Sequence, residues 1–119
     1  MICEDDPDLL KLFGMAFKSK YNVILVSSGE ECIRKFTEEK NRGNKIDLIL
    51  LDYKLSDISG DSVARKIKEY SATKIILISA YNMDDELLKE LQESNCITRY
   101  VKKPIHLNSL NKLVEETIS

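Results

Sequence analysis

The spacing of hydrophobic residues changes repeatedly along the chain. Runs of apolar and β-branched residues alternate with stretches in which apolar residues recur every three or four positions, the periods of strands and of amphipathic helices. The runs within 46–52 and 74–79 are apolar without alternation, which is typical of strands covered on both faces. The predicted strands are Met1–Glu4, Tyr21–Val26, Ile46–Asp52, Lys74–Ser79 and Ile97–Val101.

A predicted helix follows each predicted strand. Asp6 can cap the first helix and Pro7 suits its first turn, while Ser28 and Glu31 have the spacing of a capping box at the start of the second. The apolar positions expected to face the core in the five helices are, in chain order, Leu9, Phe13, Ala16 and Phe17; Cys32, Ile33 and Phe36; Val63, Ile67 and Tyr70; Leu87, Leu88 and Leu91; and Leu107, Leu110, Val114 and Ile118.

Five repeats of a strand followed by a helix predict an α/β fold, in which five helices cover both faces of a five-stranded parallel sheet. The chain has 119 residues, about the size of one ordinary domain, so residues 1–119 are expected to form a single domain with no effector domain. Ligands of such sheets bind at the carboxyl ends of the strands. The residues that end each strand are therefore the candidates for function.

Charge and composition disfavour several classes of protein. Eighteen Lys and Arg against twenty Asp and Glu give a net charge of −2, without the basic excess of a nucleic-acid surface. The longest apolar run, Leu48–Leu51, is far too short to span a membrane, and no export leader is recognised. Cys3, Cys32 and Cys96 are scattered without a zinc-binding pattern, so we expect free, buried thiols in a cytoplasmic protein.

Acidic, hydroxyl and ammonium groups end four of the five predicted strands. Glu-Asp-Asp at 4–6 follows the first strand, Asp52 ends the third, Ser79 ends the fourth and Lys103 follows the fifth. An acidic run alone is more often a helix cap, but the joint placement at one sheet edge predicts a site. Crowded carboxylates repel one another, and oxygen ligands without His or Cys suit Mg²⁺.

Such a site favours phosphoryl transfer. Asp52 can act as a nucleophile on phosphorus and form an aspartyl phosphate. Lys103 and Mg²⁺ would neutralise the charge of the transferred group, and Ser79 can donate a hydrogen bond to one phosphoryl oxygen.

In this order, and over nearly the whole chain, these residues resemble the receiver domain of response regulators in two-component signalling. The matching motifs are the acidic pair at 4–5, Leu-Leu-Asp at 50–52, a glycine eight residues later, Ser-Ala at 79–80 and Lys-Pro at 103–104. The resemblance implies a flavodoxin-like sheet of strand order 2-1-3-4-5 and a phosphorylated switch that is not an enzyme, apart from slow hydrolysis of its own aspartyl phosphate.

The resemblance also implies roles for individual residues. It assigns the phosphoacceptor to Asp52; the Mg²⁺ ligands (with Mn²⁺ as an alternative metal) to Glu4, Asp5, Asp52 and the backbone carbonyl of Lys54; the hydroxyl and the ammonium of the site to Ser79 and Lys103; and the conformational switch to Ser79 and Tyr100. It further implies a cis peptide bond between Lys103 and Pro104.

Two departures from the family pattern, and one residue beside Ser79, qualify the resemblance. The family usually has about two more residues in the first strand, so either the natural N-terminus is clipped here or this strand is short, and stability is in question. Ser56 stands where proline is common, which would loosen the loop after Asp52. Tyr81, two residues after Ser79, either shields the aspartyl phosphate from water and lengthens its lifetime or simply packs at the start of a loop.

The expected partners also follow from the resemblance. A histidine kinase or phosphotransfer protein would donate the phosphate, and the surface of the fourth helix, fifth strand and fifth helix would change to control a downstream protein. Direct contact with nucleic acid or membrane is not expected. The protein would be a monomer, with dimerisation through the fourth and fifth helices left open, as is the choice between a stand-alone regulator and a domain of a longer protein.

Rival functions are weaker but remain open. Phosphatases that form an aspartyl phosphate carry a second Asp two residues after the nucleophile, and here that position is Lys54. A receiver-like module that no longer takes phosphate would be favoured by a failure to bind Mg²⁺. Neither GxGxxG nor GxxxxGK[ST] follows any predicted strand, which disfavours a nucleotide enzyme. The single histidine, His106, is expected to be a surface or capping residue.

Overall fold

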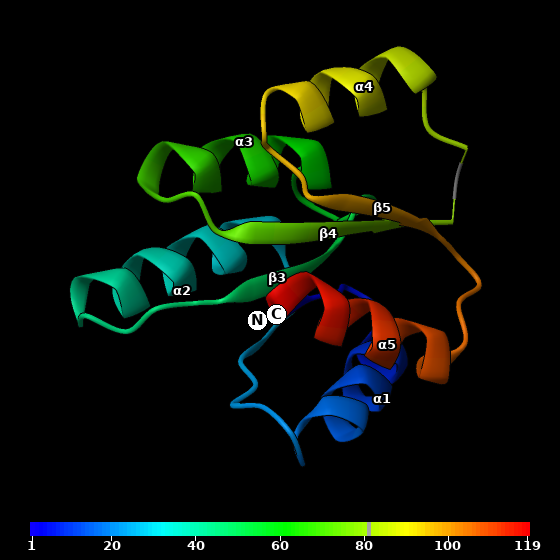
Figure 1. The fold of residues 1–119 in the computed structure, drawn as a ribbon. Helices are drawn as coiled ribbons and strands as arrows, with labels where there is room; N and C mark the ends of the chain where they lie inside the picture. Colours follow the sequence, from blue (N-terminus) through cyan, green and yellow to red (C-terminus); the bar gives the residue numbers. More distant parts are fainter. Residues whose placement is uncertain (81) are drawn as a thin grey trace.

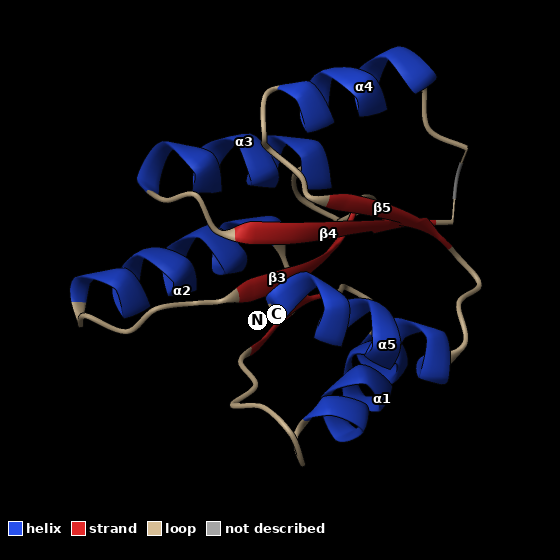
Figure 2. Cartoon of the chain, viewed as in Figure 1, coloured by secondary structure: helices blue, strands red, loops and turns tan. Residues whose placement is uncertain are grey.

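The computed structural model describes residues 1–80 and 82–119. Five strands alternate with five helices along the chain, as the periodicity predicts (Figures 1 and 2). The elements are β1 Ile2–Cys3, α1 Pro7–Phe17, β2 Leu25–Val26, α2 Gly29–Asn41, β3 Leu48–Asp52, α3 Gly60–Tyr70, β4 Lys74–Ser79, α4 Asp85–Glu93, β5 Arg99–Lys102 and α5 Leu107–Ile118.

The five strands form one parallel sheet of order β2-β1-β3-β4-β5, which confirms the predicted α/β fold. Helices α1 and α5 cover one face of the sheet, and α2, α3 and α4 cover the other (Figure 1). The strand order reverses beside β1, between β1 and β3. The carboxyl ends of these two strands are therefore the place where a fold of this kind binds its ligand.

The core consists of two clusters separated by the sheet. Along β3, Leu48 and Leu50 face α1 and α5, whereas Ile49 and Leu51 face α2 and α3. All four side chains are buried because helices cover both faces, which explains the uninterrupted apolar run in the sequence. Each such side chain contributes about 1.5–3 kcal/mol through burial, so the strand that carries Asp52 is firmly held.

Only β4 has the bounds predicted from sequence; β1 and β3 are shorter at their ends, and β2 and β5 differ for identifiable reasons. The strand predicted at Tyr21–Val26 is reduced to Leu25–Val26, because its neighbour β1 has only two residues with which it can pair. The fifth strand begins at Arg99 instead of Ile97. The backbone N–H groups of Cys96 and Ile97 both donate to the carbonyl of Leu91, which ends α4 before the chain can join the sheet.

The helix starts confirm the predicted caps, with one shift. The Asp6 carboxylate accepts from the N–H groups of Asp8 and Leu9, and Ser28 Oγ accepts from Glu31 N. The Glu31 carboxylate reaches the N–H of Ser27, one residue before the N-cap. Both ends of the capping box are therefore satisfied, although the reciprocal bond goes to the residue before its expected partner.

The prediction that Tyr70 faces the core is wrong. Its side chain is 37% exposed at the last position of α3, and the ammonium of Lys66 lies 5.8 Å from the centre of its ring. Helical periodicity places Tyr70 on the same stripe as the fully buried Ile67, but Tyr70 is the last residue of α3 and its ring lies beyond the buried part of the helix. The three cysteines are free and buried, as expected. Within the described residues, no helix has the length and apolar character needed to cross a membrane.

Candidate functional site

A pocket of about 290 Å³ lies where the carboxyl ends of the strands meet. Its walls come from the residues after β1, from the end of β3 with the loop that follows it, and from the residues after β4 and β5. The lining residues are Glu4, Asp5, Asp6, Leu9, Asp52, Lys54, Leu55, Ser56, Ala80 and Lys103. The fold therefore brings together the acidic run, the strand-end aspartate and the lysine that are far apart in the sequence.

Three carboxylates share this pocket. Glu4, Asp5 and Asp52 each offer an oxygen, and these oxygens lie within 4.8 Å of one another. Glu4 and Asp52 are buried, with exposed fractions of 2% and 7%, and Asp5 is the most open of the three. Oxygen ligands at this spacing, without His or Cys, suit a hard divalent cation that keeps part of its water shell.

Lys103 supplies the positive charge of the pocket. Its Nζ lies 2.7 Å from Glu4 Oε1 and 3.3 Å from Asp52 Oδ1. Burial opposes protonation, but the hydrogen bond to Glu4 and the charge of Asp52 outweigh burial and raise the pKa of Lys103 above its usual value. The lysine is therefore a permanent cation that bridges two buried carboxylates.

One ammonium does not compensate three carboxylates. Burial, followed by the negative charge of Glu4, raises the pKa of Asp52 to about 7, against the opposing effect of Lys103. Desolvation and the neighbouring Glu4 also raise the pKa of Asp5. This excess of negative charge is what a divalent cation would relieve, so the residues present fit such an ion.

The loop after β3 is held tightly against the end of that strand. The N–H of Gly60 donates to the carbonyl of Tyr53 at 2.6 Å. A Cβ at Gly60 would collide with the carbonyl oxygen of Asp52, so only glycine permits this approach. On the opposite wall, Lys103 N donates to Ser79 O at 2.7 Å, and the peptide bond between Lys103 and Pro104 is cis, as predicted.

Asp57 connects this loop to a different helix. Its carboxylate accepts from the backbone N–H groups of Gly29 and Glu30, both at 2.9 Å, at the N-terminus of α2. Desolvation works in the opposite direction, but these hydrogen bonds lower the pKa of Asp57 overall. The sequence gives no signal for this contact, because the partners lie 28 and 27 positions away and are backbone groups.

Of the remaining predicted residues that the structure describes, only Lys54 lines the pocket itself. Ser79 is fully buried as the last residue of β4, and Ala80 lines the pocket beside it. Tyr100 lies half-buried in β5 against the cluster that includes Leu91 of α4, and Lys54 is exposed at the pocket wall. His106 is the exposed N-cap residue of α5. Tyr81 lies outside the described residues.

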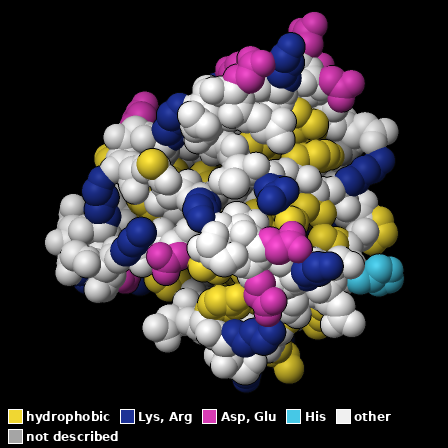
Figure 3. All heavy atoms as spheres, in the orientation of Figure 1, with side chains coloured by type: hydrophobic (Ala, Val, Ile, Leu, Met, Phe, Trp, Pro, Cys, Tyr) yellow, Lys and Arg dark blue, Asp and Glu magenta, His cyan; other side chains and the backbone are white. Residues whose placement is uncertain are grey.

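The surface around these elements carries charges of both signs. In Figure 3, basic and acidic side chains are interspersed, and acidic ones gather over the α4 end of the molecule. Helix α4 and its N-cap contribute Asp84, Asp85, Glu86, Glu90 and Glu93.

Comparison with known proteins extends the structural findings. The chain is 23% identical to the transcriptional regulatory protein GlrR of Escherichia coli over 120 residues, covering 99% of this chain and 26% of GlrR. It thus spans about a quarter of that relative's length. The solved receiver domain of a putative LuxO repressor protein from Vibrio parahaemolyticus is 26% identical, with a TM-score of 0.84 over 98% of this chain and 86% of that one.

A second solved structure is similar in fold. It contains the CheX-CheY-BeF₃-Mg²⁺ complex of Borrelia burgdorferi, with a TM-score of 0.85 at 22% identity over 99% of this chain and 87% of that one. The sequence pattern of the response regulator receiver domain matches residues 1–115, nearly the whole chain. With its parallel sheet of order 2-1-3-4-5 and its acidic pocket at the strand ends, this chain belongs to the response regulator receiver domain family.

Proposed function

We propose that the protein is a phosphorylation switch in which Asp52 accepts a phosphoryl group from a histidine kinase or phosphotransfer protein. The observation that carries the proposal is the placement of Asp52. Its carboxylate lies within 4.8 Å of those of Glu4 and Asp5, and 3.3 Å from the ammonium of Lys103. Phosphoryl transfer requires a nucleophile, carboxylates close enough together to hold one divalent cation, and a fixed positive charge.

The transfer begins with an oxygen of Asp52 directed into the pocket. This oxygen attacks phosphorus, an O–P bond forms, the P–N bond of a phosphohistidine donor breaks, and the imidazole nitrogen keeps the bonding electron pair. Glu4, Asp5, Asp52 and the backbone carbonyl of Lys54 would hold Mg²⁺ or Mn²⁺, which supplies charge neutralisation and an orienting point for phosphoryl oxygens. Lys103 already lies between Glu4 and Asp52, so a small shift brings its ammonium to a phosphoryl oxygen.

The output is carried by the surface of α4, β5 and α5. Ser79 of β4 pairs in register with Lys102 of β5, and Leu77 of β4 pairs with Tyr100. The Ser79 hydroxyl and the Tyr100 ring therefore lie on adjacent strands, two residue pairs apart along the ladder. Movement of Ser79 toward a phosphoryl group would open space for Tyr100 to turn inward, and the phosphorylated conformation gains population at the expense of the other.

Turnover as a hydrolase is not part of the proposal. Lys54 stands two residues after Asp52, at the wall of the pocket, where phosphatases of this kind have an aspartate that serves as acid and base, and a lysine does not replace that carboxyl group. The aspartyl phosphate would therefore decay only slowly, by attack of water. A long-lived phosphorylated state suits a regulator that must meet a downstream protein before it resets.

The wider setting belongs to the same proposal. Residues 1–119 act as one cytoplasmic receiver domain that controls a protein partner, without direct contact to nucleic acid or membrane. The domain works as a monomer or pairs through α4 and α5 when phosphorylated. It acts alone or within a longer chain, the second being supported by the regulator GlrR, of which the matching region is 26%.

The test uses acetyl phosphate as a small phosphodonor. The protein is incubated with acetyl phosphate and Mg²⁺, and intact mass is measured alongside Asp52→Asn. One added phosphate that needs Mg²⁺ and is absent from the variant supports the proposal. A folded protein that gains no phosphate contradicts it, and if Mg²⁺ binding is also absent, a phosphate-independent binding module becomes the better interpretation.

A further inference from the structure

Three sulfur atoms meet in the core between β1 and α2. Cys3 ends β1, Cys32 lies at the end of the first turn of α2, and Met1 directly precedes β1. The two cysteines are buried, with exposed fractions of 1% and 0%, and the half-buried Met1 packs against the same hydrophobic cluster. The pocket of Asp52 is lined by other residues, so phosphoryl transfer does not account for this cluster of sulfur atoms.

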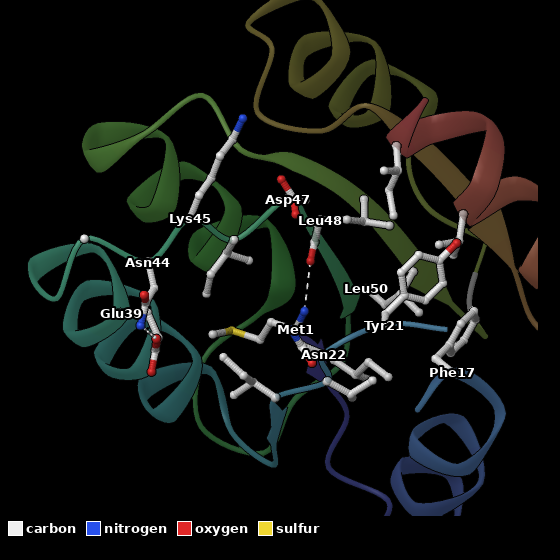
Figure 4. Close-up of a pocket in the computed structure, with 17 residues that line it drawn as sticks. Met1, Phe17, Tyr21, Asn22, Glu39, Asn44, Lys45, Asp47, Leu48 and Leu50 are labelled. Atoms are coloured by element: carbon white, nitrogen blue, oxygen red, sulfur yellow. Dashed lines mark hydrogen bonds between the residues drawn. The ribbon is translucent and has the colours of Figure 1, made fainter. Parts of the chain in front are cut away.

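The strand and the helix hold the three sulfur atoms in contact. Cys32 Sγ donates to Met1 Sδ at 3.7 Å, and Cys32 is also hydrogen-bonded to Cys3. Met1 and Cys3 are two residues apart in an extended segment, so both side chains point to the α2 side of the sheet. Figure 4 shows the Met1 thioether pointing from the start of β1 toward α2.

The carbonyl of Ser28 fixes the relative position of the two cysteines. This N-cap carbonyl accepts from Cys3 Sγ at 3.4 Å and from Cys32 N at 3.0 Å. The carboxylate of Asp57 binds two further N–H groups in the first turn of the same helix. The turn that carries Cys32 is thus held both by β1 and by the loop after β3, which makes the sulfur cluster preorganised.

The spacing of the sulfur atoms matches that of ligands around one metal ion. A metal–sulfur bond of about 2.3 Å places the sulfur atoms of a tetrahedral or trigonal complex about 3.7–4 Å apart. The separation of 3.7 Å between Cys32 and Met1 lies in this range. Thiol and thioether are soft ligands, which suit Cu(I), whereas the oxygen ligands around Asp52 suit Mg²⁺.

We propose that Cys3, Cys32 and Met1 form a binding site for one Cu(I) ion, separate from the proposed Mg²⁺ site. Because Cys3 donates its proton to the Ser28 carbonyl, Cys32 is the thiol that releases a proton and forms a copper–thiolate bond. The Cys3 thiol and the Met1 thioether each donate a lone pair. One positive charge arrives as one proton leaves, so the buried cluster gains no net charge, and no electron is transferred.

Two other roles fit this cluster less well. Zinc sites are usually built from four Cys, His or carboxylate ligands, and a thioether is not among them. Buried cysteines also serve simply as small apolar residues, and the hydrogen bond with Cys32, together with burial, raises the pKa of Cys3 and keeps it neutral in the metal-free core. That packing role does not require three sulfur atoms from a strand and a helix to converge.

The test titrates the reduced protein, without oxygen, with Cu(I) held by the coloured chelator bicinchoninate. The wild-type chain should withdraw one Cu(I) per molecule, seen as loss of chelator absorbance and as one copper in native mass spectra. Cys32→Ser should lower the affinity at least about 100-fold, since losing even an outer partner of a metal ligand costs about 10- to 100-fold. Cys96→Ser, which removes a buried thiol that contacts Ser94 after α4, should retain full affinity.

X-ray absorption identifies the ligands independently of affinity. With selenium-labelled methionine in a Met15→Leu, Met83→Leu background, copper in the otherwise unchanged chain should show sulfur neighbours and one selenium neighbour, from Met1. Thermal midpoints of the metal-free variants check folding, and Cys3→Ser replaces Cys32→Ser if the latter unfolds. No uptake by the wild type, copper without a selenium neighbour, or equal losses of affinity in Cys96→Ser and the cluster variant would overturn the proposal and leave the thiols as core residues only.

Discussion

The ammonium of Lys103 is closer to Glu4 than to Asp52, with Nζ–O distances of 2.7 Å and 3.3 Å. Glu4 therefore does two things in the pocket: it contributes an oxygen to the acidic cluster, and it holds the lysine beside the nucleophile. The same carboxylate also raises the pKa of Asp52, after burial itself. Removing the charge of Glu4 should thus have effects of opposite sign on stability and on cation binding.

For Glu4→Gln, the apparent affinity for Mg²⁺ should fall about 10- to 100-fold, because one carboxylate is lost beside the cation. The free energy of unfolding without Mg²⁺ should rise, because the repulsion between Glu4 and Asp52 is relieved. Calorimetric titration with Mg²⁺ and urea denaturation measure the two effects. Glu38→Gln, which alters an exposed ion pair with Arg34, should change neither, and equal losses in both variants would contradict the assignment.

Lys103→Ala separates metal binding from phosphoryl transfer. Mg²⁺ binding should persist, while labelling by acetyl phosphate should become much slower, because only the divalent cation remains to neutralise the transferred group. The variant should be less stable by about 1–3 kcal/mol without Mg²⁺, since Glu4 and Asp52 stay buried without their cation. Lys102→Ala is the matched control one residue away. Retained labelling in Lys103→Ala at the wild-type rate would refute the role of this ammonium.

The raised pKa of Asp52 predicts a pH dependence of cation binding. With a pKa of about 7 in the folded protein, Asp52 is partly protonated near neutral pH, and a cation must displace that proton. Apparent Mg²⁺ affinity should rise as pH increases to about 7 and level off above it. Titration at a series of pH values measures this, and Asp52→Asn should show a flatter profile; a profile of the same steepness would place the titration elsewhere.

The free energy of unfolding without Mg²⁺ should also depend on Asp52, but it should fall as pH rises. The folded state holds the Asp52 proton up to about pH 7, whereas an unfolded aspartate loses it near 3.8. Between these values the folded state binds more protons, so the contribution of Asp52 to the free energy of unfolding falls as pH rises. The difference in unfolding free energy between wild type and Asp52→Asn, followed from pH 4 to 8, isolates this contribution.

Asp57 should act as a positioning residue for the loop after β3. Asp57→Ala removes both hydrogen bonds to the start of α2 and should cost about 1 kcal/mol, the usual effect of losing a helix cap. It should also weaken Mg²⁺ binding, because the loop carries Lys54. Ser28→Ala removes a different cap of the same helix without touching the loop. Equal weakening of Mg²⁺ binding in both variants would show that α2, and not the loop connection, is responsible.

Much of this site could be predicted from sequence because its parts are local. Apolar runs indicate the strands, and the polar residues at the ends of β1, β3 and β5 line one pocket because parallel strands end at one edge of the sheet. The caps at Asp6 and Ser28 depend on residues two or three positions away, so they too were predictable.

The features that escaped prediction depend on partners far away in the chain. The length of β2 is set by how much of β1 lies beside it, and no pattern within 21–26 contains that information. The exposure of Tyr70 depends on where α3 ends relative to its neighbours. The contact of Asp57 with α2 joins a side chain to backbone groups, which have no residue identity to recognise.

The ion pair between Glu4 and Lys103 joins residues 99 positions apart, across nearly the entire chain. Closing so long a loop costs conformational entropy, and contacts between distant residues slow folding. Glu4 follows β1 and Lys103 follows β5, so the pocket gains its cation only when both strands have joined the same sheet. The charge balance around Asp52 therefore depends on the folding of the whole domain and not on β3 alone.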